Sequence, residues 1–373
     1  MKRPLIDAVQ GVAVLAKRQV PITGGSPVDI VRCVVAIALC VSSALCGVGQ
    51  ASTGDRAIID TDFRTNCDDA GALAMLHALA DRGECEIIGV VASTTGPHVV
   101  AAIDAVNTYY GRGDLPVGLS PRPSLPEGPG ADNYAPALAD PARFPSDATN
   151  ATAPESTALY RKLLYGSPDG SVKIVVVGGQ SCLAMLLQSA ADHEADGSIG
   201  VTGADLVRAK VRETVIMGGA FRQPNRWEFN IKLDVKAADA VAQHWPGPIV
   251  YSGFEVGDRV MTGGTLQHPD TNPIALAYTL GQHTGDGVGK PGPRQSWDQT
   301  AVYYAVRGTG DAQSPLWRLS DPVTIRFKGK TEFAPAVDAL APDQLRRYLI
   351  DAAPKAEVAG RIDVLMLQPL ADR

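Results

Sequence analysis

Four aspartates stand close together between a short apolar run and a helical pattern, and this placement constrains the fold more than any other feature. Residues 57–60 are typical of the end of a buried strand, and residues 70–79 carry apolar side chains at helical spacing. A core cannot hold so many carboxylates unless a cation neutralises them. The simplest such cation is a divalent metal ion. The four aspartates are Asp60, Asp62, Asp68 and Asp69.

The residue types in this cluster indicate which ion would bind. Carboxylate oxygens are hard ligands that suit Ca²⁺ or Mg²⁺, whereas zinc would require His or Cys nearby. The alternative is structural, with Asp68 or Asp69 capping the following helix, because the free N–H groups of a helix start favour an Asp. One cap would explain one aspartate and leave the other three unexplained.

Strand-like and helical patterns alternate along the chain and predict one α/β domain over residues 52–373. They indicate a mostly parallel central sheet with helices on both faces. Ligands bind such sheets at the carboxyl ends of the strands, where the aspartates are expected. Further strand-like runs are residues 86–92, 172–177, 214–217 and 248–251, and helical patterns include residues 99–110 and 183–191.

Two long runs rich in small or turn-forming residues interrupt this alternation, at residues 120–156 and 281–295. Loops of such length are usually lids or binding loops. The second run leads directly to Trp297 and Asp298, so we expect it to close over the metal site.

The first 51 residues have the pattern of a secretory signal. Two basic residues at 17 and 18 precede an apolar run over residues 30–45, which Arg32 and two serines interrupt, and small residues follow up to Ala51. We expect cleavage after Ala51 and an exported protein, periplasmic or secreted, with no stable membrane partner afterwards. The alternatives are lipid attachment at Cys46 or an uncleaved anchor, whose uncharged run is shorter than the roughly 20 residues of a spanning helix.

Composition indicates an ordinary globular protein whose ligand is a small molecule. Of the 373 residues, 45% are hydrophobic and 20% are charged, and the net charge of −6 provides no basic surface for nucleic acid. The sequence is compatible with a homo-oligomer. The odd number of cysteines after residue 51 argues against a disulfide framework; these are Cys67, Cys85 and Cys182.

Several motifs resemble, in the same order, those of the inosine-uridine nucleoside hydrolase family. The acidic stretch is similar to the family's opening DxDxxxDDAxAL signature, with two extra residues between Asp62 and the Asp pair. The resemblance runs from about Asp55 nearly to the end of the chain. The other similar segments are residues 178–184 (family GPLTNLA), 217–221 (MGG), 227–230 (EFN), 296–302 (HDPxAV), and 346–349 with 362–366, which resemble the family's closing helix.

The resemblance implies a nucleoside-hydrolase-like fold, Ca²⁺ as cofactor and a small-molecule nucleoside substrate. It implies that Asp62 is the general base. The metal ligands that it implies are Asp62, Asp69, the carbonyl of Ser181, and Asp298. The substrate contacts that it implies are Asp68, Met217, Glu228, Asn230 and Trp297.

The implied reaction is hydrolysis of the N-glycosidic bond of a ribonucleoside, or of a related ribosyl compound, to free base and ribose. A hard cation suits this reaction because it can hold the sugar hydroxyls and lower the pKa of a water. A carboxylate then removes a proton from that water during attack at C1′. Nearby anionic groups would stabilise the oxocarbenium-like transition state.

Two departures from the family pattern bear on the substrate. Trp297 stands where relatives have a His, and an indole can offer a leaving base only an N–H and a stacking face. Gly96, Pro97 and His98 stand where the family has a Gly-Asn pair whose Asn touches the ribose. His98 either takes over a polar contact or is a solvated residue at a helix start.

Two other classes of function remain as alternatives. The first is a phosphatase with a DxD pair at a strand end, because Asp60 and Asp62 have that spacing, although Arg64 occupies a place where that class has Thr or Val. The second is a non-catalytic exported protein that binds a nucleoside or sugar through the same metal site. Asp62 argues against this second alternative.

Overall fold

The structure is a computed structural model, and it describes residues 54–63, 66–122, 134–192, 200–223, 225–281, 292–336, 341 and 344–370. The leader predicted over residues 1–51 lies outside these residues, as do residues 123–133 and 282–291 of the two predicted loops. Within the described residues, no helix combines the length and the apolar character needed to cross a bilayer.

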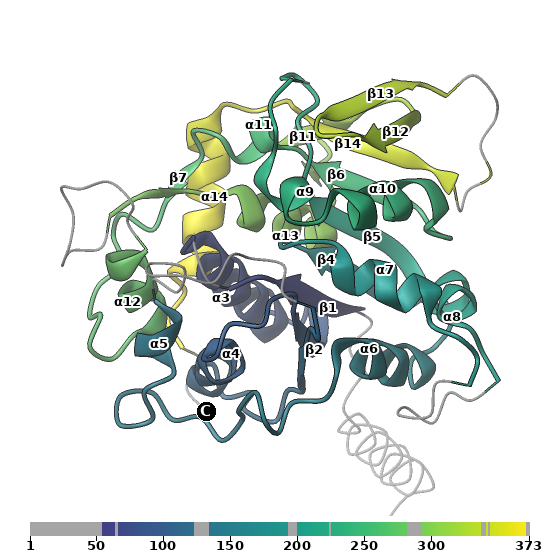
Figure 1. The fold of residues 1–373 in the computed structure, drawn as a ribbon. Coiled ribbons are helices and arrows are strands. Elements are labelled where there is room, and N and C mark those ends of the chain that lie inside the picture. The colour runs from purple at the N-terminus through teal and green to yellow at the C-terminus, as the bar shows by residue number, and fades with distance from the viewer. Residues whose placement is uncertain are drawn as a thin grey trace, which may run out of the picture. The chain divides into compact units, whose positions relative to one another are not determined.

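A sheet of eight strands runs through the described residues (Figure 1). Neighbouring strands are parallel except for β11, which pairs antiparallel with β14 at one edge. The predicted mostly parallel α/β fold is confirmed. In order across the sheet the strands are β11 (Trp317–Leu319), β14 (Arg346–Asp351), β6 (Ile249–Ser252), β5 (Val211–Met217), β4 (Val172–Val176), β1 (Asp55–Thr61), β2 (Cys85–Ala92) and β3 (Val117–Leu119).

Successive strand residues point to opposite sides of the sheet, and helices pack against both sides, so both faces are buried. Ile59 and Val175 belong to one apolar cluster, and their neighbours Ile58 and Ile174 belong to the other. Helices that contribute to the first cluster are α3 (Asp68–Asp81), α4 (Val99–Tyr109), α5 (Ala135–Leu138), α12 (Pro273–Leu280), α13 (Trp297–Arg307) and α14 (Lys355–Met366). Helices that contribute to the second are α6 (Ser156–Tyr165), α7 (Ser181–Gln188), α8 (Gly203–Lys210) and α10 (Val235–His244).

The remaining elements are short. A hairpin that joins two five-residue strands adds Val323, Ile325 and Phe327 to the second cluster. The short helices are α9 (Phe229–Leu233) and α11 (Phe254–Gly257), and the paired strands are β7 (Met261–Thr262) with β8 (Arg294–Gln295), β9 (Gly310–Asp311) with β10 (Ser314–Pro315), and β12 (Val323–Phe327) with β13 (Thr331–Pro335).

The helix predicted at residues 346–349 is wrong, because these residues belong to strand β14. Arg346 is buried there, and its guanidinium donates to the carbonyl oxygens of Ala242, Trp245 and Gly247 at the end of α10. That long-range contact holds the segment beside β6, where it pairs in parallel. Residues 362–366 do lie in a closing helix, α14.

The central strands end at the same edge of the sheet, and this alignment determines where a site can form. Asp60 on β1 pairs with Val176 on β4, which pairs with Ile216 on β5. Met217 on β5 in turn pairs with Ser252 on β6. The segments that follow β1, β4, β5 and β6 therefore leave the sheet side by side.

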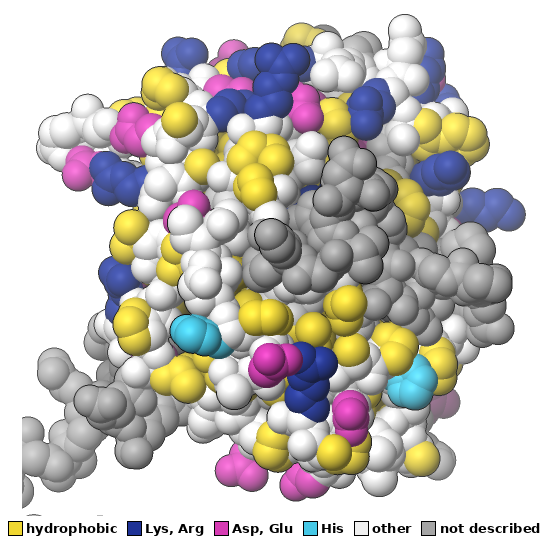
Figure 2. Space-filling view, turned by 90° about the vertical axis from the view of Figure 1, so that its left-hand side faces the viewer, with side chains coloured by type: hydrophobic (Ala, Val, Ile, Leu, Met, Phe, Trp, Pro, Cys, Tyr) yellow, Lys and Arg dark blue, Asp and Glu magenta, His cyan; other side chains and the backbone are white. Residues whose placement is uncertain are grey.

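Charged side chains are interspersed on the face of the molecule that Figure 2 shows. Blue and magenta side chains both occur among the side chains that are drawn in colour there.

Candidate active site

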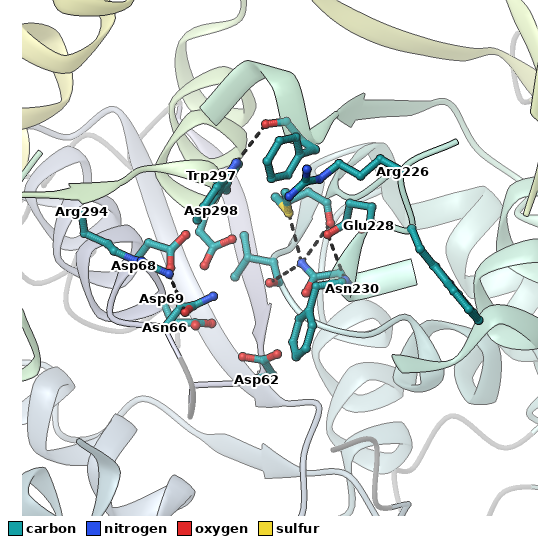
Figure 3. Close-up of a pocket in the computed structure, with 15 residues that line it drawn as sticks. Asp62, Asn66, Asp68, Asp69, Arg226, Glu228, Asn230, Arg294, Trp297 and Asp298 are labelled. Carbon is teal, nitrogen blue, oxygen red and sulfur yellow. Dashed lines mark hydrogen bonds between the residues drawn. The ribbon is translucent and has the colours of Figure 1, made fainter. Parts of the chain in front are cut away.

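A cavity of about 440 Å³ opens at the carboxyl edge of the sheet (Figure 3). Every residue predicted for the site lines it except Ser181. Its walls come from the segments after β1, β4, β5 and β6 and from the start of α13. Several further residues line the cavity that were not among the predicted site residues; these are Asn66, Val177, Arg226, Trp227, Phe229, Phe254 and Arg294.

Three buried carboxylates converge in this cavity. Asp68 and Asp69 lie in the first turn of α3 and Asp298 in the first turn of α13, and one oxygen from each lies within 4.8 Å of the others. The capping alternative for Asp68 and Asp69 is wrong, because Cys67 is the N-cap of α3 and no side chain caps that helix.

Asp69 also ties the end of β1 to the start of α3. Its Oδ1 accepts hydrogen bonds from the hydroxyl of Thr61 and, at 3.2 Å, from the N–H of Phe63. Phe63 has a positive φ of 43°, a conformation that a bulky residue adopts only where its surroundings enforce it. The carboxylate of Asp69 therefore holds the main chain where β1 ends, at Thr61 and Phe63.

Burial and mutual repulsion make these carboxyl groups hard to ionise. Burial raises the pKa of Asp68 to about 6, although the nearby guanidinium of Arg294 opposes that rise. Burial raises the pKa of Asp69 and of Asp298 well above the usual range, and the neighbouring carboxylates raise both further. Oδ1 of Asp68 accepts no hydrogen bond from any described residue. Such a set of hard, underneutralised oxygens fits a divalent cation.

The two aspartates at the end of β1 have different surroundings. Asp60 does not line the cavity; it accepts a hydrogen bond from the hydroxyl of Tyr160 at 2.8 Å, and its burial raises its pKa to about 7. Asp62 lines the cavity. Gly178 lies so close that an added Cβ would stand 2.7 Å from the main-chain nitrogen of Asp62, so a larger residue there would displace the predicted base.

Ser181 and His98 lie apart from the lining. The hydroxyl of Ser181 donates to Asp234 at 2.9 Å, and Ser181 begins α7. Its carbonyl as a metal ligand stays a prediction. His98 is exposed at the start of α4, which fits a solvated helix-start residue.

Glu228 and Asn230 are held by the main chain. Glu228 is the N-cap of α9; one carboxylate oxygen accepts from the N–H of Asn230 at 3.0 Å, and the other accepts from the N–H groups of Ile231 and Gly219, each at 3.1 Å. The amide nitrogen of Asn230 donates to the carbonyls of Val177 at 2.9 Å and Met217 at 3.2 Å. This arrangement orients the Asn230 amide and leaves its Oδ1 as the acceptor for a ligand.

Trp297 presents a face to the cavity, but its N–H is already used. The indole N–H donates to the carbonyl of Phe254 at 2.9 Å, and the two rings lie 5.4 Å apart at 31°. Helix α11 packs so closely on the start of α13 that a Cβ on Gly257 would stand 2.3 Å from the Cα of Trp297. Of the two contacts expected for this indole, only stacking remains.

The family to which the chain belongs follows from a match over most of its length. A model of the family described as inosine-uridine preferring nucleoside hydrolase matches residues 57–341. The chain belongs to this nucleoside hydrolase family. Membership makes it a hydrolase that acts on N-glycosyl bonds, and it removes the basis for the phosphatase alternative.

Solved nucleoside hydrolases share the fold at low sequence identity. A plant nucleoside hydrolase, the PpNRh1 enzyme, matches 84% of this chain and 99% of its own with a TM-score of 0.59 and 18% identity. A purine-preferring ribonucleoside hydrolase from Gardnerella vaginalis matches 83% of this chain and 99% of its own, with a TM-score of 0.60 and 18% identity. The type III effector protein XopQ, solved with adenosine diphosphate ribose, matches 84% of this chain and 92% of its own, with a TM-score of 0.59 and 16% identity. A comparison with curated proteins found no match.

We predict that the metal-free nucleoside hydrolase loses stability as the pH rises from about 4 to about 7. Asp60 and Asp68 have pKa values of about 7 and about 6 in the folded chain, against 3.8 ordinarily. The folded state therefore keeps protons that the unfolded chain has released, and its stability falls as the pH passes through the raised values.

Thermal melts of chelated protein at about pH 5.5 and about pH 8 test this prediction, with the lower melting temperature expected at the higher pH. Added calcium should reverse the order, because a metal binds the ionised carboxylates. Equal melting temperatures of the chelated protein at the two pH values would contradict the prediction. They would show that folding does not raise the pKa values of these carboxyl groups.

Proposed function

We propose that the chain is a calcium-dependent hydrolase that cleaves ribonucleosides, or related ribosyl compounds, to the free base and ribose. Family membership provides the type of bond. The observation that carries the calcium dependence is the convergence of the buried carboxylates of Asp68, Asp69 and Asp298 in the cavity that Asp62 also lines.

The chemistry of the donor set supports calcium over softer metals. No described His or Cys lines the cavity, which leaves carboxylate, carbonyl and amide oxygens as ligands. Such oxygens suit Ca²⁺, which accepts more ligands and looser geometry than Mg²⁺. Asp69 and Asp298 would hold the ion, and Asp68 lies close enough to contribute as well. By the family resemblance, Asp62 and the carbonyl of Ser181 would complete its ligands. When bound, it would anchor the sugar hydroxyls and lower the pKa of a water.

The residues of the chain then divide the remaining work. Asp62 accepts a proton from the attacking water, whose oxygen bonds to C1′ as the bond from C1′ to the base nitrogen breaks. Oδ1 of Asn230 accepts a hydrogen bond from a sugar hydroxyl. Trp297 offers the base a stacking surface and no proton, so the leaving nitrogen takes its proton from water.

Larger ribosyl compounds stay among the candidate substrates. The XopQ structure contains adenosine diphosphate ribose, a ribosyl compound of greater size than a nucleoside. This likeness supports keeping such compounds in an activity screen beside simple nucleosides.

We also propose that the protein is exported and acts outside the cytoplasm. The basic, apolar and small-residue segments before Ala51 support this proposal. N-terminal sequencing of the protein recovered from cell fractions would test it, and a chain recovered intact from the cytoplasm alone would contradict it.

We predict that Asp298→Ala weakens calcium binding at least about tenfold, because it removes one anionic ligand from a buried site. Calorimetric titration of the chelated protein with calcium measures the change. Asp321→Ala is the matched control, because Asp321 is exposed and outside the cavity lining. Equal affinity in folded Asp298→Ala would remove Asp298 from the metal site.

We predict that Asp62→Asn lowers turnover at least about 10²-fold, because the amide keeps the volume but cannot accept the proton of the water. Release of the base from a nucleoside, followed by chromatography, measures turnover. Near wild-type turnover would transfer the base role to another carboxylate, with Asp68 the first to test. Tight nucleoside binding by the wild type without any base release would instead favour the non-catalytic alternative.

A further inference from the structure

Two arginines border the cavity on either side of an aromatic pair. The guanidinium carbon of Arg226 lies 3.5 Å from the ring centroid of Phe254, and that of Arg294 lies 5.5 Å from the ring centroid of Trp297. Figure 3 shows Arg294 beside Asp68, whereas Arg226 lies across the cavity from Asp62, Asp68 and Asp69. Cations are unexpected around a neutral nucleoside, which offers them no charge.

The two arginines differ in what they already contact. Arg294 donates to Oδ1 of Asn66 at 2.8 Å and acts on the charge of Asp68, so it belongs to the acidic side of the cavity. Arg226 is exposed; its guanidinium lies over the ring of Phe254 and makes no hydrogen bond or ion pair with a described residue. The closest acid in sequence, Glu228, already accepts three main-chain hydrogen bonds.

Stacking on Phe254 prepares Arg226 for a particular kind of ligand. A ring covers one face of a guanidinium and leaves the N–H groups at its edge free to donate. Those N–H groups form a planar fork that matches two oxygens of a phosphate. Because the stacked side chain is already restrained, less conformational entropy is lost when it binds.

Exposed aromatic rings continue from Arg226 along the same rim. Trp227 and Phe229 line the cavity, yet 54% and 42% of their surfaces are exposed. Lys232 does not line the cavity itself, but its ammonium lies 5.7 Å from the centroid of the Trp227 ring. The rim is thus cationic and aromatic, while the floor of the cavity is acidic.

We propose that Arg226 forms an anion subsite at the rim, so that the preferred substrates are N-ribosyl compounds with a phosphate on the sugar. This inference rests on the proposed function. Water adds its oxygen to C1′ and the base leaves with a proton, so that a nucleoside 5′-monophosphate gives free base and ribose 5-phosphate. The phosphate ester takes no part in the reaction. Figure 3 shows Arg226 on the side of the cavity where Glu228 and Asn230 lie, which are the residues that the family resemblance assigns to the sugar, so its fork would serve the sugar end of the substrate.

The first test compares kcat/KM for a nucleoside and its 5′-monophosphate with the calcium-loaded protein. We expect the wild type to prefer the monophosphate. Arg226→Gln should lower kcat/KM for the monophosphate at least about tenfold, mainly through KM, because one charge-assisted pair is lost. The same change should alter kcat/KM for the nucleoside less than about threefold. Arg226→Lys keeps the charge without the planar fork, so its kcat/KM for the monophosphate should lie between those of the wild type and Arg226→Gln.

Arg222→Gln is the matched control. Arg222 is an exposed arginine of the same segment that pairs with Asp351 at 3.4 Å and does not line the cavity. It should leave both kcat/KM values unchanged. A wild type that prefers the nucleoside, or equal losses on both substrates in Arg226→Gln, would overturn the anion subsite while leaving N-ribosyl hydrolysis intact.

The second test measures binding without catalysis. Calorimetric titration with ribose 5-phosphate and with ribose should show tighter binding of the phosphate in the wild type, and Arg226→Gln should abolish that difference. If no substrate is cleaved but this Arg226-dependent binding is found, the anion subsite stands and the hydrolase proposal fails. Ribose 5-phosphate that binds no more tightly than ribose would overturn the subsite.

Discussion

Carboxylates of like charge, gathered in a buried place, are the constraint on which the rest of this structure depends. Asp68, Asp69 and Asp298 each place one oxygen close enough to the others to share a metal ion, although burial and repulsion oppose their ionisation. The arrangement persists because the surrounding fold imposes it. Thr61 and the N–H of Phe63 hold Asp69, and the packing of α13 against α3 brings Asp298 to the same point. The sheet provides the edge at which these segments meet.

Local patterns were sufficient to predict the parts of the fold that depend on local order. Strands β1, β2, β4, β5 and β6 and helices α3, α4 and α7 fall where apolar runs and helical spacing indicate them. The acidic turn was predicted for the same reason, because its residues are contiguous. The family motif added Asp298, whose distance along the chain hides it from any local pattern. Residues 346–349 misled the prediction because the partners that make them a strand lie in α10 and β6.

The cationic half of the cavity was missed for a similar physical reason. Phe254 carries no sequence signal, since a single aromatic residue after a strand is ordinarily a core residue. Arg226 is held in place only because its guanidinium stacks on the ring of Phe254. The indole N–H of Trp297 is unavailable to a ligand only because it donates to the carbonyl of Phe254. One residue at the start of a short helix thus determines what two others can offer a substrate, and only the assembled structure shows it.

The site also joins segments that are far apart in the chain, and this has a consequence for how the protein matures. Arg294 and Asn66, which flank the carboxylates, are 228 residues apart. Closing so long a loop is entropically costly, so contacts of this kind form late in folding. A growing chain that has not yet released α13 lacks Asp298 and therefore the third carboxylate of the cluster. The ion proposed above would therefore bind fully only to the completed fold, and its binding would oppose unfolding once the last third of the chain is in place.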